Sequence, residues 1–245
     1  MRMIPTSSDF GYGSDMRNEQ QPDWEEVLSS AARLQEIIPG AVLVGGTASA
    51  LFADHRFSRD ADHILADLTE RFDSILADLE SVAGWKTARV KRPVMILGSL
   101  DGIETGIRQL IRTAPLETIQ IKREGKALTV PSEGEILRIK GVLILKRNAT
   151  RDYLDFAALA KHLGFEKFRA ALLGFDNLYP QPNGESALQQ LQIQLAEPLP
   201  YDLEESQLIE YKNLREDLAD WSKVRQLCIG LSLDMFSFIE GARKA

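Results

Sequence analysis

The feature that most constrains the fold is an apolar strand that runs into a glycine turn, followed after a short helix by a segment with two aspartates. The turn consists of Gly45, Gly46 and Thr47, and the aspartates are Asp60 and Asp62. Glycine lets the backbone approach a ligand closely, and a helix that begins near Thr47 directs free N–H groups at an anion. This order of elements predicts a phosphate site where the strand passes into the helix.

The spacing of the two aspartates indicates a metal. Side chains at positions i and i+2 of a strand point to the same face, so Asp60 and Asp62 can bind the same magnesium cluster. A Gly-Gly-Thr turn alone commonly does no more than connect a strand to a helix, and an Asp-x-Asp pair alone is commonly a solvated loop. Together they predict a joint nucleotide and metal site, with Mg²⁺ or Mn²⁺ as the cofactor.

Length and charge restrict the class of protein. With 245 residues, of which 44% are hydrophobic and 27% charged, the chain can fold on its own into one domain with a substantial second lobe. A net charge of −7 argues against indiscriminate binding to nucleic acid, which depends on many Lys and Arg contacts, although a local basic groove is compatible with it. The single cysteine, Cys228, cannot form an internal disulfide, which favours a reducing compartment.

The location of the protein is predicted from two further observations. The first 22 residues lack the charged start and the continuous apolar stretch of a signal peptide, and we expect them to form a mobile leader. The sequence contains no uninterrupted apolar run of about eighteen residues, which is the length that a membrane-spanning helix requires. We therefore predict a cytoplasmic protein with no membrane partner.

The apolar spacing predicts an α+β chain in two parts. Helical spacing at residues 24–38 and 68–82 flanks a strand at 41–44, and the short β-prone runs between residues 85 and 130 are expected to complete a mixed sheet. A capping box at Ser132-x-x-Glu135 opens a region whose pattern is helical. The predicted parts are a leader over 1–22, a core over 23–131 and a helical lobe over 132–245.

A third carboxylate is expected on a neighbouring strand, because sites in which two metal ions bridge a triphosphate and an attacking hydroxyl commonly use one. Glu104 is the first candidate, since it shares a strand face with Gly106 and has open space around it. Asp101 is the second candidate. The alternative is that Glu104 is a solvent-facing acid paired with Arg108.

Lys140 occupies an unusual position in the predicted helix over residues 133–147. Its neighbours three and four positions away are all apolar, namely Ile136, Leu137, Leu143 and Ile144. A cation in such surroundings extends outward to solvent, pairs with an acid or meets a ligand, because burying an unpaired ammonium is costly. A nucleotide phosphate or the acid cluster would suit it.

The segment after this helix combines helix ends with charge. We predict a helix end at Asn148 and a new N-cap at Thr150, with Asp152 in the first turn and an ion pair between Arg151 and Asp155. Capping and an exposed ion pair would explain these residues without any function. However, positive charge gathers here beside Lys140 on an acidic chain, which predicts contact with a triphosphate or RNA; it comes from Arg138, Lys146, Arg147 and Arg151.

These residues together resemble the AbiEii-type nucleotidyltransferases, which are associated with abortive infection and type IV toxin–antitoxin systems. The resemblance spans about residues 40 to 163 and rests on three motifs: Gly45-Gly46-Thr47-Ala48, then His55-Arg56-x-Ser58-x-Asp60-x-Asp62, then Lys140 with Arg147-x-x-x-Arg151-Asp152-x-x-Asp155. Two departures are Ala61 and His63, which replace bulkier apolar residues beside the aspartates, and Glu104 has no firm match.

The resemblance implies a polymerase-β-like nucleotidyltransferase core followed by a helical lobe. It implies that Asp60 and Asp62 bind Mg²⁺ and that the turn binds the nucleotide's phosphates, with Ser58 in the same motif. Lys140 and Asp152 would match the family's later catalytic lysine and aspartate, and Arg147 and Arg151 would lie beside the nucleotide.

The implied reaction moves a nucleoside monophosphate from an NTP to an acceptor hydroxyl. In toxin members of the family the acceptor is RNA, such as a tRNA end, and a cognate antitoxin is a partner. One alternative is a non-catalytic protein that uses the same fold to sense nucleotide or to regulate a partner. The other is an antibiotic-modifying nucleotidyltransferase, whose cationic substrate the acidic pI of 5.2 would suit.

Overall fold

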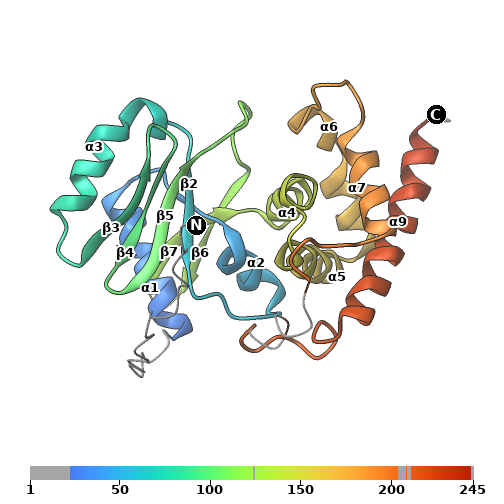
Figure 1. Cartoon of the computed structure of the whole chain (residues 1–245), viewed down its shortest axis with the longest axis horizontal. Coiled ribbons are helices and arrows are strands. Elements are labelled where there is room, and N and C mark those ends of the chain that lie inside the picture. The colour runs from blue at the N-terminus through green and yellow to red at the C-terminus, as the bar shows by residue number, and fades with distance from the viewer. Residues whose placement is uncertain (1–22, 124, 204–207, 209–210, 244–245) are drawn as a thin grey trace, which may run out of the picture.

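The computed structural model describes residues 23–123, 125–203, 208 and 211–243, and the predicted leader lies outside the described residues. A sheet with its helices forms one side of the molecule, and a group of helices forms the other (Figure 1). In the described chain every strand ends by Pro131, and the elements that follow are helices. This arrangement confirms the predicted α+β class with a helical C-terminal region.

The main sheet has five strands in the order β1-β2-β5-β4-β3. Their bounds are β1 (Val42–Leu43), β2 (Ala61–Leu65), β3 (Trp85–Lys91), β4 (Met95–Leu100) and β5 (Ile103–Gln109). β2 pairs with β5 in parallel, whereas the other pairs are antiparallel, so the sheet is mixed as predicted. The aspartate segment therefore lies next to the central strand β5.

Two helices cover one face of this sheet. α1 (Trp24–Ile37) and α3 (Leu68–Ser81) bury an apolar cluster that includes Leu34, Phe72 and Ile107. His63 of β2 is also fully buried, and burial lowers its pKa to about 4, so it is a neutral core residue on an inward-facing position. Because successive strand residues alternate between faces, Asp62 projects from the opposite, uncovered face.

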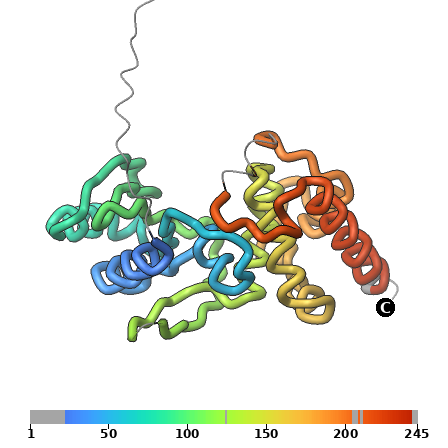
Figure 2. The backbone as a smooth tube through the Cα atoms, turned by 90° about the horizontal axis from the view of Figure 1, so that it is seen from below, coloured from blue at the N-terminus to red at the C-terminus, as the bar shows by residue number. Residues whose placement is uncertain are grey.

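The next two strands do not join the main sheet, contrary to the expectation that residues 85–130 complete it. β6 (Thr118–Arg123) and β7 (Lys126–Pro131) form a separate antiparallel hairpin, which is the light-green arm in Figure 2. The Gln35 side chain of α1 donates to the Thr129 carbonyl and accepts from the Thr129 amide, both at 2.8 Å. It thereby occupies backbone groups of β7 that a further strand would need.

The helices that follow β7 form the other side of the molecule. Its members are α4 (Glu133–Arg147), α5 (Thr150–Leu172), α6 (Phe175–Leu178), α7 (Ala187–Ala196) and α9 (Trp221–Arg243). α2 (Gly45–Ala53) lies between the sheet and α5, so it connects the two sides (Figure 1). None of the helices in the described part of the chain combines the length and the hydropathy needed to cross a membrane.

The capping predictions for this region are met in part. Ser132 caps α4 by accepting from the Glu135 amide at 3.2 Å, and Asn148 ends α4 in the left-handed conformation with φ of 47°. Thr150 is the first residue of α5 and not its N-cap. Its hydroxyl and amide both donate to Asp202, which supplies from a distant segment the acceptor that the helix end requires.

Candidate active site

A cleft of about 970 Å³ opens on the uncovered sheet face, between β2 and β5 on one side and α4 on the other. It is lined by most of the predicted site residues, namely Gly45, Gly46, Ser58, Asp60, Asp62, Glu104, Lys140, Arg147 and Arg151. These residues come from segments up to about a hundred positions apart in the sequence. The fold therefore gathers the separate sequence motifs around one space.

The glycine turn lies directly against the aspartate segment. Gly45 has φ of +75°, which favours glycine, and a Cβ built there would lie 3.6 Å from the Cβ of Asp62. A Cβ on Gly46 would lie 2.3 Å from Nη2 of Arg56 and 2.8 Å from Oγ of Ser58. Gly45 is thus favoured by its backbone conformation, and Gly46 by the close approach of the Arg56 and Ser58 side chains.

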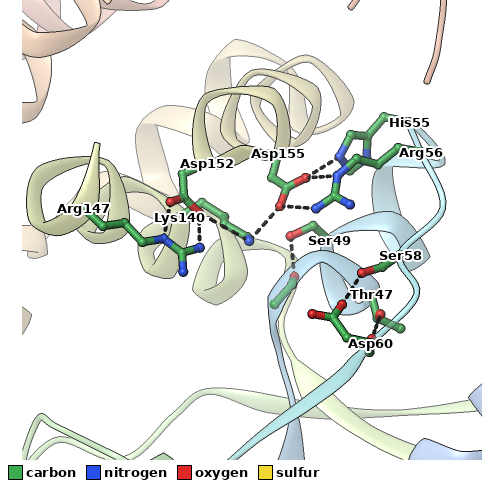
Figure 3. A network of polar contacts seen from close by, with 11 residues as sticks. Thr47, Ser49, His55, Arg56, Ser58, Asp60, Lys140, Arg147, Asp152 and Asp155 are labelled. Atoms are coloured by element: carbon green, nitrogen blue, oxygen red, sulfur yellow. Dashed lines mark hydrogen bonds and ion pairs between the residues drawn. The ribbon is translucent and has the colours of Figure 1, made fainter. Parts of the chain in front are cut away.

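Thr47 has a different place from the one expected. α2 begins at Gly45, two residues earlier than predicted, so Thr47 lies within its first turn and its side chain is fully buried. The Thr47 hydroxyl donates to the backbone carbonyl of Asp60 (Figure 3). This hydroxyl ties the turn to the aspartate segment, and it is the start of α2 that presents N–H groups to the cleft.

The two aspartates face the same cleft. Ser58 Oγ donates to Oδ1 of Asp60 at 2.6 Å and so orients that carboxylate (Figure 3). Burial and the neighbouring Asp60 charge raise the pKa of Asp62, with Arg108 acting in the opposite sense. Two partly desolvated carboxylates side by side repel each other, and a divalent cation between them would remove that repulsion.

The strand register places Glu104 on the face that Asp62 uses. β2 and β5 pair Asp62 with Gly106, and Glu104 stands two residues before Gly106, so all three share one side of the sheet. Glu104 is exposed and lines the cleft. Asp101 lies instead in the turn between β4 and β5, where Arg33 pairs with it, and it does not line the cleft.

Within the described residues, no group of three or more His, Cys, Asp or Glu side chains converges closely enough to hold a metal ion. Glu104 therefore shares the cleft with Asp60 and Asp62 without completing a three-carboxylate cluster with them. Mg²⁺ in nucleotide enzymes is commonly bound by one or two carboxylates, with phosphate and water oxygens filling the other positions. The pair of aspartates fits such a site.

Lys140 is buried and pairs with an acid that is also buried. Its Nζ lies 2.7 Å from Oδ2 of Asp155, and Asp155 also contacts Nε2 of His55 at 2.7 Å and Nε of Arg56 at 2.8 Å (Figure 3). Burial alone would raise the pKa of Asp155, but Arg56, Lys140 and His55 hold it well below its usual range. Asp155 is therefore an anion that fixes cationic side chains at the cleft.

This cluster corrects one prediction. The expected ion pair between Arg151 and Asp155 is wrong, because Asp155 points into the protein and Arg151 is exposed on the cleft wall. Besides Lys140, the partners of Asp155 are His55 and Arg56, about a hundred residues earlier in the chain. The sequence signal that could have found them is the His55-Arg56 dipeptide, which stands directly before the aspartate segment.

Asp152 has a supporting place. Its side chain is fully buried and lies outside the cleft lining, 3.7 Å from Lys140 Nζ. It accepts two hydrogen bonds from the Arg147 guanidinium, including one of 2.6 Å from Nη2. Asp152 therefore orients Arg147, which lines the cleft, and is not itself placed to touch a ligand there.

A C-terminal segment that the sequence did not predict also lines the cleft. The Phe57 amide donates to the Lys212 carbonyl at 2.9 Å, and the Arg215 amide donates to the His55 carbonyl at 2.8 Å. These bonds bring Tyr211 to the cleft, with its ring centroid 5.4 Å from the Arg56 guanidinium. No local pattern marks this pairing, since it joins segments more than 150 residues apart.

Comparison with known sequences gives relatives of a much larger size. No family model matches the chain. The mycolic acid-containing lipids exporter MmpL11 of Mycolicibacterium smegmatis is 32% identical over 226 residues, which cover 91% of this chain and 22% of that protein. The heme uptake protein MmpL11 of Mycobacterium tuberculosis is 34% identical over 127 residues, or 51% of this chain and 13% of that protein. The chain thus spans less than a quarter of the length of the curated relatives it matches.

Comparison with solved structures identifies the fold. The JHP933 protein of Helicobacter pylori matches with a TM-score of 0.55 at 16% identity and covers 92% of this chain and 96% of that chain. A second H. pylori structure, assigned to the nucleotidyltransferases, matches with a TM-score of 0.54 at 16% identity and covers 91% and 98%. The chain therefore has the nucleotidyltransferase fold.

Proposed function

We propose that the protein is a nucleotidyltransferase that moves a nucleoside monophosphate from an NTP to an acceptor hydroxyl. The observation that carries this proposal is the convergence, in one cleft, of the glycine turn, the aspartate pair and the cations of α4 and α5. The likeness to solved structures supports the fold, and the side chains of the cleft support the chemistry.

Asp60 and Asp62 would hold the divalent cation, Mg²⁺ or Mn²⁺. When bound, such a cation supplies Lewis-acid stabilisation of phosphate oxygens. The fit rests on the position of the two carboxylates, which line the same cleft beside the glycine turn. Ser58 keeps one of the two carboxylates in place through its hydrogen bond to Asp60.

The cations of the cleft would hold the triphosphate. Arg56 and Arg147 are oriented by buried carboxylates, and Lys140 is held at the same wall. In the reaction the acceptor oxygen forms a bond to the α-phosphorus while the bond to the bridging oxygen breaks, and pyrophosphate leaves. These cations would stabilise the charge that develops on pyrophosphate. We propose exposed Glu104 as the base that takes the hydroxyl proton.

We further propose that the acceptor is RNA, such as a tRNA end, and that the protein acts as a toxin with a cognate antitoxin. The resemblance of the sequence motifs to those of the AbiEii-type family is the basis of this finer proposal. Arg59, Arg151 and Lys212 also line the cleft and add positive charge beside the phosphate site on a chain whose net charge is −7.

The names of the MmpL11 relatives describe transport of heme or of lipids by much longer proteins. We do not extend these roles to this chain, because it corresponds to less than a quarter of each relative. The cleft chemistry favours nucleotidyl transfer.

Label transfer tests the proposal. The purified protein is incubated with each of the four α-³²P-labelled NTPs, with Mg²⁺ or Mn²⁺, and with total RNA, protein or an aminoglycoside panel as acceptor. Label in RNA that disappears in Asp62→Asn but persists in Asp67→Asn supports the full proposal; Asp67 pairs with Arg71 away from the cleft. Label in a drug would favour the antibiotic-modifying alternative, and NTP binding without any transfer would favour a sensor.

A further inference from the structure

The cleft has two ends of different chemistry. The cationic end consists of Arg56, Lys140, Arg147 and Arg151, beside the aspartates. The apolar end consists of Ile111, Leu116, Ile139 and Tyr179. On α4, Ile139 directly precedes Lys140 and stands eight residues, or about 12 Å along the helix axis, from Arg147. The cleft is therefore elongated, with charge at one end and hydrocarbon at the other.

Two polar side chains near the apolar end, Arg112 and Gln109, are already engaged within the protein. Arg112 donates to the Ala114 and Pro115 carbonyls and to the Tyr179 hydroxyl. It also forms an ion pair with buried Glu135 at 2.9 Å. The Gln109 amide bonds to the backbone of Thr69, Ala66 and Leu110. What this end offers to a ligand is therefore mainly apolar and aromatic surface.

The Arg112 contacts also fix the loop that carries Ile111. Four bonds from one guanidinium hold residues 112–115 against Tyr179 and α4. Ile111 nevertheless leaves 73% of its surface exposed at the cleft wall. A large apolar side chain held exposed on an anchored loop gains free energy when a ligand covers it.

We propose that the apolar end is the site for the nucleobase of the NTP, held by apolar contact and stacking with little discrimination among the bases. This inference rests on the proposed function and specifies how the same cleft recognises the nucleobase of its substrate. A nucleoside triphosphate carries its charge at one end and a flat ring at the other. The cleft likewise has cations at one end and apolar surface at the other. Every base has a π-face, whereas Arg112 and Gln109, which could read base edges at this end, are engaged internally.

Calorimetric titration tests this assignment with a double variant, Ile111→Ser with Leu116→Ala. Ile111 is exposed and Leu116 is half-buried, so the fold tolerates both changes. The matched control is Ile193→Ser with Leu188→Ala on α7, where Ile193 is 60% exposed and Leu188 is partly buried. The probes are ATP, GTP, CTP, UTP and inorganic tripolyphosphate, each with Mg²⁺.

We expect the Kd of every NTP to rise about tenfold in the double variant, since the lost apolar contact is that of roughly one side chain. The Kd of tripolyphosphate should stay unchanged, because it occupies only the cationic end, and the control should bind all probes normally. An equal loss for NTP and tripolyphosphate would overturn the assignment, as would no loss for either. A preference of the wild type for one base by on the order of a hundredfold would contradict recognition by contact alone.

The same titrations separate the two proposals. If the wild type binds neither NTP nor tripolyphosphate, the proposed function fails and the nucleobase site fails with it. If both bind and only the response to the double variant is missing, the nucleobase site alone is wrong.

Discussion

Helix α4 carries two buried charge clusters whose difference explains how this fold makes an anion site. Toward its C-terminal half, Lys140 joins Arg56 and His55 around Asp155. Toward its N-terminal half, Arg138 joins Arg112 around Glu135. Both central carboxylates are fully buried, so both clusters are part of the core of the protein.

The two clusters differ in their charge balance and in their access to the cleft. At the Glu135 cluster, Glu117 supplies a second carboxylate at 2.6 Å from Arg138, so two acids face two guanidinium groups. At the Asp155 cluster, Asp155 and Asp152 face His55 and three cations, namely Arg56, Lys140 and Arg147, and all three cations line the cleft. The first cluster is neutral and structural, whereas the second retains positive potential for a ligand.

The largest expected effect is on stability, and it should be similar in the two clusters. Asp155→Ala and Glu135→Ala each leave buried cations unpaired, which costs about 3–5 kcal/mol of unfolding free energy in such clusters. Urea denaturation measures this loss. The two variants should differ when tripolyphosphate is added, since it can replace Asp155 beside Arg56 and Lys140, whereas neither Glu135 nor Arg138 lines the cleft. Equal rescue of both variants would remove the distinction between the clusters.

The pH dependence of the same variants sharpens this comparison. Because the folded-state pKa of Asp155 lies well below its usual range, its stabilising effect is fully present above the unfolded-state pKa of about 3.9. This stabilising effect is lost as the pH falls from the unfolded-state pKa toward the lower folded-state pKa of Asp155. The stability difference between wild type and Asp155→Ala should therefore be constant at neutral pH and should shrink in acid, as measured by urea unfolding between pH 7 and pH 2.

The next largest effect is on catalysis. Lys140→Met removes the ammonium from the cleft, and we expect kcat/KM for nucleotidyl transfer to fall about a hundredfold, the usual loss for one group that stabilises transition-state charge. Arg138→Met lies on the same helix and disrupts the Glu135 cluster instead. It should lower the stability of the protein while kcat/KM of the folded enzyme stays at the wild-type value. A comparable loss of kcat/KM in both variants would contradict the assignment of a catalytic role to the Asp155 cluster and a structural role to the Glu135 cluster.

A smaller effect is expected at the glycine turn. In Gly46→Ala the new methyl group would meet the Arg56 guanidinium and Ser58, so Arg56 must move and a charge-assisted contact to phosphate is lost. We expect the Kd for NTP to rise about tenfold. Gly230→Ala on α9 is the control, since a Cβ there meets nothing within 4 Å, and it should leave the Kd unchanged. An unchanged Kd in Gly46→Ala would show that Arg56 does not contact the nucleotide.

The smallest effect has the opposite sign. Asp62→Asn relieves burial of a charge and the repulsion from Asp60, so it should stabilise the protein by about 1 kcal/mol in the absence of divalent cations. Because the pKa of Asp62 is raised, its carboxyl is neutral in acid, and its ionisation lowers the stability of the wild type as the pH rises. The stability difference between Asp62→Asn and the wild type should therefore vanish in acid. Thermal unfolding in EDTA measures this difference, and a destabilised variant would contradict the account of the pair.

Much of this arrangement could be predicted from the sequence where it depends on local pattern. The helix over 133–147, the left-handed end at Asn148 and the shared face of Glu104 and Gly106 follow from periodicity and capping. The convergence of the aspartates with the glycine turn was predicted and lies in the described cleft.

The remainder depends on tertiary contacts that no local pattern encodes. Two partners of Asp155 come from residues 55 and 56, about a hundred residues away in the sequence, and Tyr211 reaches the cleft through backbone pairing with residue 57 and its neighbours. Asp152 and Thr47 have motif positions that suggested contact with a ligand, yet both are buried and orient other residues. Sequence motifs thus identified the members of the site, while packing decided which of them face the cleft.

The most direct test of the central claim is a crystal structure with Mn²⁺ and a non-hydrolysable NTP analogue, analysed by anomalous scattering. The account predicts a Mn²⁺ peak between the carboxylates of Asp60 and Asp62, with the triphosphate beside Lys140 and Arg147. A peak bound away from both aspartates, or an analogue bound outside this cleft, would contradict it.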